Sequence, residues 1–136
     1  MQFIENNIWL VLITMVSGVM LVWSMLGNKL RGIKEADCAA ALQLINHKEA
    51  VVLDVREADE FSNGHLLNAK HIPVGKLRER IGELERYRDK PMVVVCRSGQ
   101  RSATACMLLG REKFTQVYNL AGGVLAWQKA NLPLEK

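Results

Sequence analysis

The residues of this chain best suited to chemistry form one short loop, residues 96–102, with the sequence CRSGQRS. The apolar run MVVV before the loop predicts a buried strand, and the segment after it predicts a helix. A cysteine between a parallel strand and a helix N-terminus occupies the usual ligand position of an α/β sheet. The helix dipole, the free N–H groups of its first turn and the two arginines of the loop all favour an anion there. The pattern therefore predicts that Cys96 has a lowered pKa and acts as a nucleophilic thiolate.

The rest of the loop is expected to bind an anionic substrate. Guanidinium groups match the geometry of oxyanions, so we expect Arg97 and Arg101 to hold the substrate. We expect Gly99 to adopt a backbone conformation that other residues resist, which lets successive backbone N–H groups face the anion. The opposing interpretation is a buried structural cysteine with two solvated arginines. The predicted substrate-binding residues are Arg97, Ser98, Gly99, Gln100, Arg101 and Ser102.

The cysteine content indicates neither a disulfide framework nor a zinc site. The chain has three cysteines, an odd number, and no zinc-type spacing. A single reactive thiol in a reducing compartment fits this usage better. Cys38 and Cys106 fall in predicted helices and are expected to be packing residues; the alternative for Cys106 is a disulfide that resolves a persulfide on Cys96. We expect no metal and no cofactor.

Strands and helices alternate from residue 35 to the end of the chain, which is the pattern of an α/β fold with a parallel sheet covered on both faces. The formal net charge is +4, but basic and acidic residues alternate along helical stretches. This indicates solvated faces, so we expect no nucleic-acid partner. Predicted strands cover residues 50–56, 69–74, 92–95 and 115–120, and predicted helices cover residues 35–46, 57–63, 76–87, 102–112 and 124–130.

The N-terminal part of the chain is very different in composition. The first 28 residues carry a single charge, Glu5, and include an uncharged apolar run, Ile8–Leu26. A helix over this run is about 28 Å long, close to the hydrocarbon thickness of a bilayer, with Trp9 and Trp23 near its ends. The run therefore predicts a transmembrane helix. The alternatives are a buried core helix and a signal peptide, although a signal peptide normally begins with basic residues.

Basic residues follow the apolar run and do not precede it. Lys29, Arg31 and Lys34 lie directly after it, so the positive-inside rule places the C-terminal part in the cytoplasm. We therefore expect a single-pass protein of an inner or plasma membrane. The predicted parts are a short tail over residues 1–7, a transmembrane helix over 8–26, a basic linker over 27–34 and a globular domain over 35–136.

Three motifs follow one another in the globular part: LDVRE at residues 53–57 with Glu60-Phe61 and Gly64-His65, the CRSGQRS loop, and LAGG at residues 120–123 with Trp127. In this order they resemble the motifs of the rhodanese (thiosulfate sulfurtransferase) family. The resemblance covers roughly residues 34–134 and implies a rhodanese-like three-layer fold with a five-stranded parallel sheet.

The resemblance also implies an activity. Cys96 would take a sulfane sulfur from thiosulfate or a persulfide donor, carry it as a persulfide and pass it to a thiol or protein acceptor. The loop would bind the donor. Asp54, Arg56, Glu60 and His65 would have supporting roles, with Arg56 and Glu60 as an ion pair and His65 as a hydrogen-bond donor that fixes a loop.

Two other functions are open at this point. Tyrosine phosphatases, and the cell-cycle phosphatases that share the rhodanese fold, place an arginine six positions after the cysteine. This chain has Ser102 there and its arginine one position earlier, at Arg101, which disfavours a phosphatase or an arsenate reductase. The other function is a membrane-bound sulfur-relay or protein-interaction module with little activity of its own.

Overall fold

The computed structural model describes the backbone of residues 1–30 and 33–136 and the side chains of residues 1–26 and 33–136. The chain divides into two compact units, Met1–Gly32 and Ile33–Lys136. The predicted basic linker falls partly on residues 31 and 32, which lie outside the described ones.

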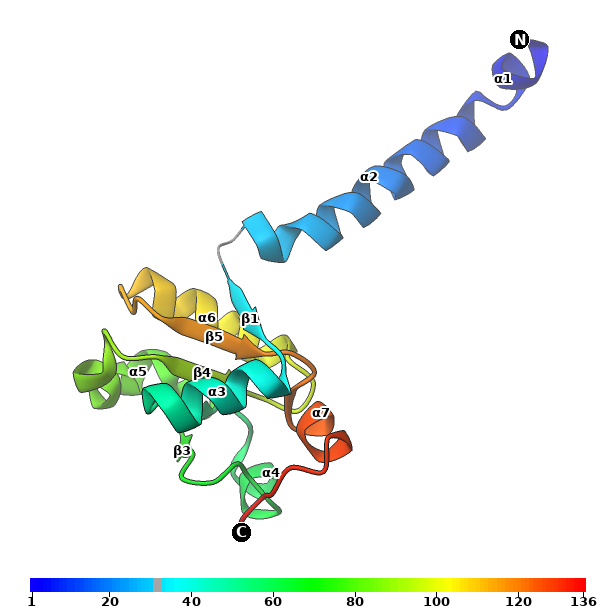
Figure 1. Cartoon of the computed structure of the whole chain (residues 1–136). Helices are drawn as coiled ribbons and strands as arrows, with labels where there is room; N and C mark the ends of the chain where they lie inside the picture. Colours follow the sequence, from blue (N-terminus) through cyan, green and yellow to red (C-terminus); the bar gives the residue numbers. More distant parts are fainter. Residues whose placement is uncertain (31–32) are drawn as a thin grey trace. The chain divides into compact units, whose positions relative to one another are not determined.

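The first unit consists of a short helix, α1 (Gln2–Asn6), and a long one, α2 (Ile8–Leu30) (Figure 1). Within α2, Ile8–Leu26 is apolar and long enough to cross a membrane. Its large side chains are not covered within the first unit, with Trp9 76% and Trp23 69% exposed. A membrane span and a signal sequence both fit such a helix.

The second unit is built on a five-stranded sheet in which all neighbouring strands are parallel. The order across the sheet is β1-β5-β4-β2-β3, so β4 is the central strand. This confirms the predicted α/β fold and the number of strands. The strands are β1 (Lys34–Ala36), β2 (Val51–Asp54), β3 (Lys70–His71), β4 (Met92–Val95) and β5 (Val117–Leu120).

Helices cover both faces of the sheet, and each face has its own apolar core (Figure 1). Successive residues of β4 point to opposite faces: Met92 and Val94 pack with the α5–α6 side, Val93 and Val95 with the α3–α7 side. The helices are α3 (Cys38–Lys48), α4 (Ala58–Ser62), α5 (Leu77–Arg80), α6 (Gln100–Arg111) and α7 (Gly123–Lys129), with 3₁₀ turns η1 (Val74–Lys76) and η2 (Ile81–Tyr87).

The edge strand β1 was not predicted, because its residues were assigned to the linker and to the start of a helix. The strand has three residues and pairs only with β5, so the sequence KEA carries no apolar run that would reveal it. The helix that follows begins later than predicted. Asp37 caps it, with its carboxylate accepting a hydrogen bond of 2.8 Å from the backbone N–H of Ala40.

Two further predictions about elements were wrong in extent. The helix predicted over residues 76–87 is a single α-turn, α5, between two 3₁₀ segments, and Gly82 in the second segment weakens an α-helix. The strand predicted over 69–74 is reduced to two residues, β3, which lie before Pro73. Helix α6 begins at Gln100 and not at Ser102, which brings its first turn closer to Cys96.

Candidate active site

Cys96 lies directly after the central strand, where the chain turns into α6. All four residues of β4 are buried, and Cys96 itself is only 1% exposed. Gly99 makes the turn with a φ of 102°, a left-handed conformation that favours glycine, and α6 begins at the next residue. Helix α6 therefore starts four residues after the cysteine, with the N–H groups at its start directed back toward the sulfur.

The sulfur atom of Cys96 accepts two hydrogen bonds. The backbone N–H of Gly99 lies 3.0 Å from Sγ, and the hydroxyl of Ser102 lies 3.3 Å from it. Burial raises the pKa of this thiol, but the Ser102 hydroxyl and the backbone N–H groups of Ser102, Gly99 and Ser98 outweigh burial. The pKa of Cys96 is therefore lower than the ordinary value, and the site stabilises a thiolate.

Asn119, at the end of β5, supports this arrangement and was not predicted from the sequence. Its side-chain oxygen accepts a hydrogen bond from the Ser102 hydroxyl, and its side-chain nitrogen donates to the carbonyl of Gly99 at 3.0 Å. Ser102 and Asn119 are both buried. The available signal was a polar residue in the otherwise apolar end of a predicted strand, immediately before the LAGG motif.

The N-terminus of α7 holds the cysteine loop from the other side. The backbone N–H of Val124 donates to the carbonyl of Cys96 at 2.9 Å, and that of Leu125 donates to the carbonyl of Arg97 at 3.2 Å. Gly123 allows this approach, since a Cβ atom on it would lie 2.3 Å from the Cys96 carbonyl oxygen. The LAGG motif therefore acts through its backbone: it brings α7 against the loop.

Arg101 is engaged by a carboxylate. Its two terminal nitrogens donate to the two oxygens of Glu60 at 2.7 and 2.9 Å, a bidentate pair between α6 and α4. These hydrogen bonds lower the pKa of Glu60 to about 2, against the opposing effect of burial. Arg101 is near enough to Cys96 for the two charges to interact, but its guanidinium is already partnered.

Arg97 is different, because no described residue forms a hydrogen bond or ion pair with its side chain. It is exposed and borders an open cavity of ≈ 260 Å³ that Glu60, Leu125 and Gln128 also line. Gln100 and Ser98 are exposed as well. Of the two predicted anion-binding arginines, the structure therefore leaves Arg97 available for a ligand.

Two of the four predicted supporting residues, Arg56 and Glu60, line the same cavity as Arg97, but the four are paired differently from what the resemblance implied. Buried Arg56 pairs with Asp54 at 2.7 Å and also donates to the carbonyl of Gly64 at 2.7 Å. The expected pair of Arg56 with Glu60 is therefore wrong, because Glu60 binds Arg101. His65 hydrogen-bonds the carbonyl of Phe61 through Nδ1 at 2.9 Å and stacks on the Phe61 ring, which fixes that loop as expected.

All three cysteines are free thiols that form no disulfide with one another. Burial raises the pKa of Cys106 to about 12, and the neighbouring Cys96 adds to this effect, so Cys106 stays a thiol. Cys38 is half-buried at the start of α3. Among the residues that the structure describes, no group of His, Cys, Asp and Glu side chains is arranged to hold a metal ion.

Comparison with known proteins identifies a family model, curated relatives and solved structures that are similar to this chain. The family model described as a rhodanese-like domain matches residues 37–130. The uncharacterized protein YibN of Escherichia coli strain K12 is 32% identical, over 98% of this chain and 94% of its own length. The thiosulfate sulfurtransferase GlpE of Shewanella oneidensis is 36% identical over 66% of this chain and 87% of its own. The crystal structure of a rhodanese-related protein from Thermoplasma volcanium superimposes with a TM-score of 0.68 and 34% identity, covering 75% of this chain and 97% of that one.

Proposed function

Because the chain belongs to the rhodanese-like family, we propose that it is a sulfurtransferase in which Cys96 carries a sulfane sulfur as a persulfide. Relatives named as sulfurtransferases support the general activity. The observation that carries the proposal for this chain is the environment of one atom. The Cys96 sulfur is buried, lies at a helix N-terminus and accepts hydrogen bonds from Gly99 and Ser102.

The first half of the reaction loads the cysteine. The Cys96 thiolate attacks the outer sulfur of a donor such as thiosulfate and forms a new S–S bond. The S–S bond of the donor breaks, and its electron pair leaves with sulfite. Cys96 is left as a persulfide anion, whose charge the N–H groups at the start of α6 stabilise. Arg97, which is unpaired among the described side chains, holds the anionic donor beside the loop.

The second half of the reaction transfers the outer sulfur from Cys96 to an acceptor. A nucleophilic acceptor, either cyanide in an assay or a small thiol or a protein thiol in the cell, attacks the outer sulfur of the persulfide. The S–S bond on Cys96 breaks and the cysteine leaves as a thiolate, with the Gly99 N–H and the Ser102 hydroxyl within hydrogen-bond distance of its sulfur. Those groups therefore stabilise the leaving group of the second step as well as the nucleophile of the first.

The same geometry argues against phosphoryl transfer. A phosphatase of this fold uses an arginine at the sixth position after the cysteine, and here that position is buried Ser102, hydrogen-bonded to Asn119. The nearby Arg101 is held by Glu60. A cysteine that is only 1% exposed suits attack on a single terminal sulfur atom better than attack on a tetrahedral phosphoryl group.

The direct test is sulfite release from thiosulfate, with thiocyanate formation in the presence of cyanide, by the full-length chain in detergent micelles. Cys96→Ser is the test variant and Cys106→Ser is the matched control. We expect activity in the wild type and in the control and none in Cys96→Ser. Equal rates in wild type and Cys96→Ser would refute the proposal that the chain is a sulfurtransferase that acts through Cys96. A wild type that loads sulfur but transfers it only to a partner protein would favour the sulfur-relay alternative.

We further propose that α2 tethers this activity to a membrane, with the globular unit on the cytoplasmic side. The apolar run Ile8–Leu26 and the basic residues that follow it support this arrangement. The chain should fractionate with membranes, and a truncation that begins at residue 27 should be soluble. Full-length chain in the soluble fraction would contradict the tether.

A further inference from the structure

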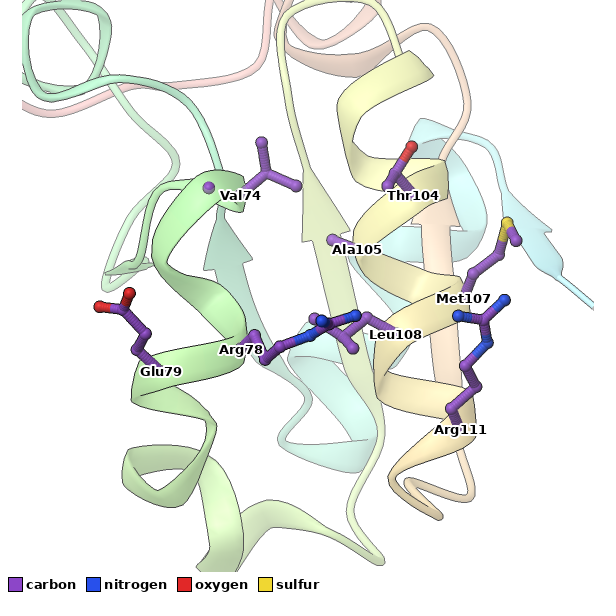
Figure 2. Close-up of a pocket in the computed structure, with 9 residues that line it drawn as sticks. Val74, Arg78, Glu79, Thr104, Ala105, Met107, Leu108 and Arg111 are labelled. Atoms are coloured by element: carbon purple, nitrogen blue, oxygen red, sulfur yellow. The ribbon is translucent and has the colours of Figure 1, made fainter.

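A second pocket, of ≈ 390 Å³, lies between α5 and α6 (Figure 2). Its apolar lining includes Val74, Ala105 and Leu108, which Figure 2 shows directed into the space between the two helices. No residue of the 96–102 loop lines this pocket. It is large enough for a small organic molecule and is separate from the cysteine.

Two arginines at this pocket are unpaired, whereas other arginines of the same segments are not. The side chains of Arg78 and Arg111 form no hydrogen bond or ion pair with any described residue. Figure 2 shows Arg78 reaching from α5 toward Leu108 of α6, and Arg111 running back along α6 toward Met107, and both arginines line the pocket. Elsewhere on α5 and α6, Arg80 and Arg101 each have a carboxylate at 2.7 Å, namely Glu83 and Glu60.

The one carboxylate that lines the pocket does not neutralise these charges. Glu79 lies on α5 beside Arg78, and Figure 2 shows its carboxylate directed away from the pocket and from both arginines. Two like charges over an apolar surface repel each other, and an anion placed between them removes that repulsion. Each guanidinium also offers paired N–H donors in the geometry of a carboxylate or phosphate.

We propose that this pocket binds an organic oxyanion: a carboxylate or phosphate, held by Arg78 and Arg111, that carries an apolar body packed on Val74, Ala105 and Leu108. The inference does not depend on the proposed sulfur transfer, since none of the lining residues belongs to the cysteine loop. Binding should therefore be unchanged in Cys96→Ser, and loss of sulfur transfer and loss of this site are distinguishable.

The test is a titration of the full-length chain in nanodiscs of zwitterionic lipid, followed by the methyl NMR signals of Val74, Ala105 and Leu108. The probes are phenylacetate and phenyl phosphate, with neutral phenylacetamide and inorganic phosphate as controls. We expect saturable shifts at these methyl groups with at least one of the two organic anions. Both controls should bind at least about fivefold more weakly, because each lacks either the charge or the apolar body.

Single substitutions then test which arginines bind the anionic group of the probe. Arg78→Gln and Arg111→Gln should each weaken binding by about fivefold or more. Arg80→Gln removes the same charge from α5, outside the pocket, and should leave binding unchanged. All three positions are at the surface, so the methyl spectra should retain the dispersion of a folded protein.

Three results would overturn the proposal. One is equal binding of phenylacetamide and the organic anions. Another is equal affinity in Arg78→Gln, Arg111→Gln and Arg80→Gln. The third is methyl shifts that appear on adding anionic lipid to the nanodiscs and not with either organic anion, which would indicate contact with a membrane surface.

Discussion

The Ser102 hydroxyl lies 3.3 Å from the Cys96 sulfur and also donates a hydrogen bond to the side-chain oxygen of Asn119. A hydroxyl has one proton, so it donates to one of these acceptors at a time. When Cys96 is a thiol, the hydroxyl serves Asn119 and can accept from the S–H group. A thiolate is a stronger acceptor than an amide oxygen, so we expect the hydroxyl to donate to the sulfur when Cys96 is ionised.

Ser102→Ala should raise the pKa of Cys96, because the thiolate loses a hydrogen-bond donor and the thiol does not. We expect an increase of about one pH unit, which corresponds to about 1.4 kcal/mol. The pH dependence of the alkylation rate of Cys96 measures it, with a wild-type midpoint below about 8.5. Ser98→Ala is the control, since Ser98 acts on the sulfur through its backbone N–H. Equal midpoints in wild type and Ser102→Ala would show that the hydroxyl does not stabilise the thiolate.

The pair of Glu60 with Arg101 should make stability depend on pH in the acid range. Hydrogen bonds from Arg101 lower the pKa of Glu60 from 4.5 to about 2, so the unfolded chain binds a proton that the folded chain excludes. The stabilisation is complete above about pH 4.5 and is lost as the pH falls toward 2. Glu60→Gln should therefore be less stable than wild type at pH 7, and the difference should disappear near pH 2.

Urea unfolding of the full-length chain in detergent micelles at several pH values measures this difference. Glu83→Gln is the matched control, because Glu83 also pairs with an arginine, Arg80, but at an exposed site. An exposed ion pair contributes little to stability, so this variant should follow wild type at every pH. A Glu60→Gln variant as stable as wild type at pH 7 would contradict a stabilising role for the pair.

The alternation of strands and helices and the position of the cysteine loop were predictable from the sequence, because both depend on local patterns. The run MVVV is long enough to identify a central strand, and the loop contains its own cysteine, glycine and arginines. The edge strand β1 was missed because three residues, two of them charged, carry no periodicity. A helix or strand can be recognised from local sequence only where its burial requires a regular pattern of apolar residues.

The pairing within the site was less predictable, because it depends on which segments meet after folding. Glu60 and Arg101 are 41 positions apart, and Ser102 and Asn119 are 17 apart, so no spacing rule connects them. The resemblance assigned Glu60 to Arg56, a nearer partner, while the fold gives Arg56 to Asp54. As a result Arg97, not Arg101, is the arginine left free for an anion.

Gly123→Ala should destabilise the globular unit and displace the cysteine loop. The new Cβ would lie 2.3 Å from the Cys96 carbonyl oxygen, at a residue whose φ is +58°. We expect a loss of at least about 2 kcal/mol in the free energy of unfolding, with reduced sulfite release. Gly110→Ala, in α6 with open space around it, should instead stabilise by about 0.5 kcal/mol. Equal urea midpoints for the two variants would be inconsistent with a close contact between α7 and the loop.

Cys106→Ala should retain sulfur transfer. Its thiol stays protonated because burial raises its pKa to about 12, so it does not compete as a nucleophile or resolve the persulfide. Thiocyanate formation should remain within about twofold of wild type, since the change removes one buried sulfur from the α6 side of the core. Accumulation of a Cys96–Cys106 disulfide during turnover of the wild type would contradict this assignment.

The central claim, that Cys96 carries the transferred sulfur, is tested most directly by the intact mass of the full-length chain after exposure to thiosulfate. The account predicts a gain of one sulfur atom, localised to Cys96 and removed by cyanide as thiocyanate. Cys96→Ser should gain nothing, and Cys106→Ala should gain as the wild type does. A wild type with unchanged mass that nevertheless releases sulfite, or an equal gain in Cys96→Ser, would contradict the persulfide on Cys96.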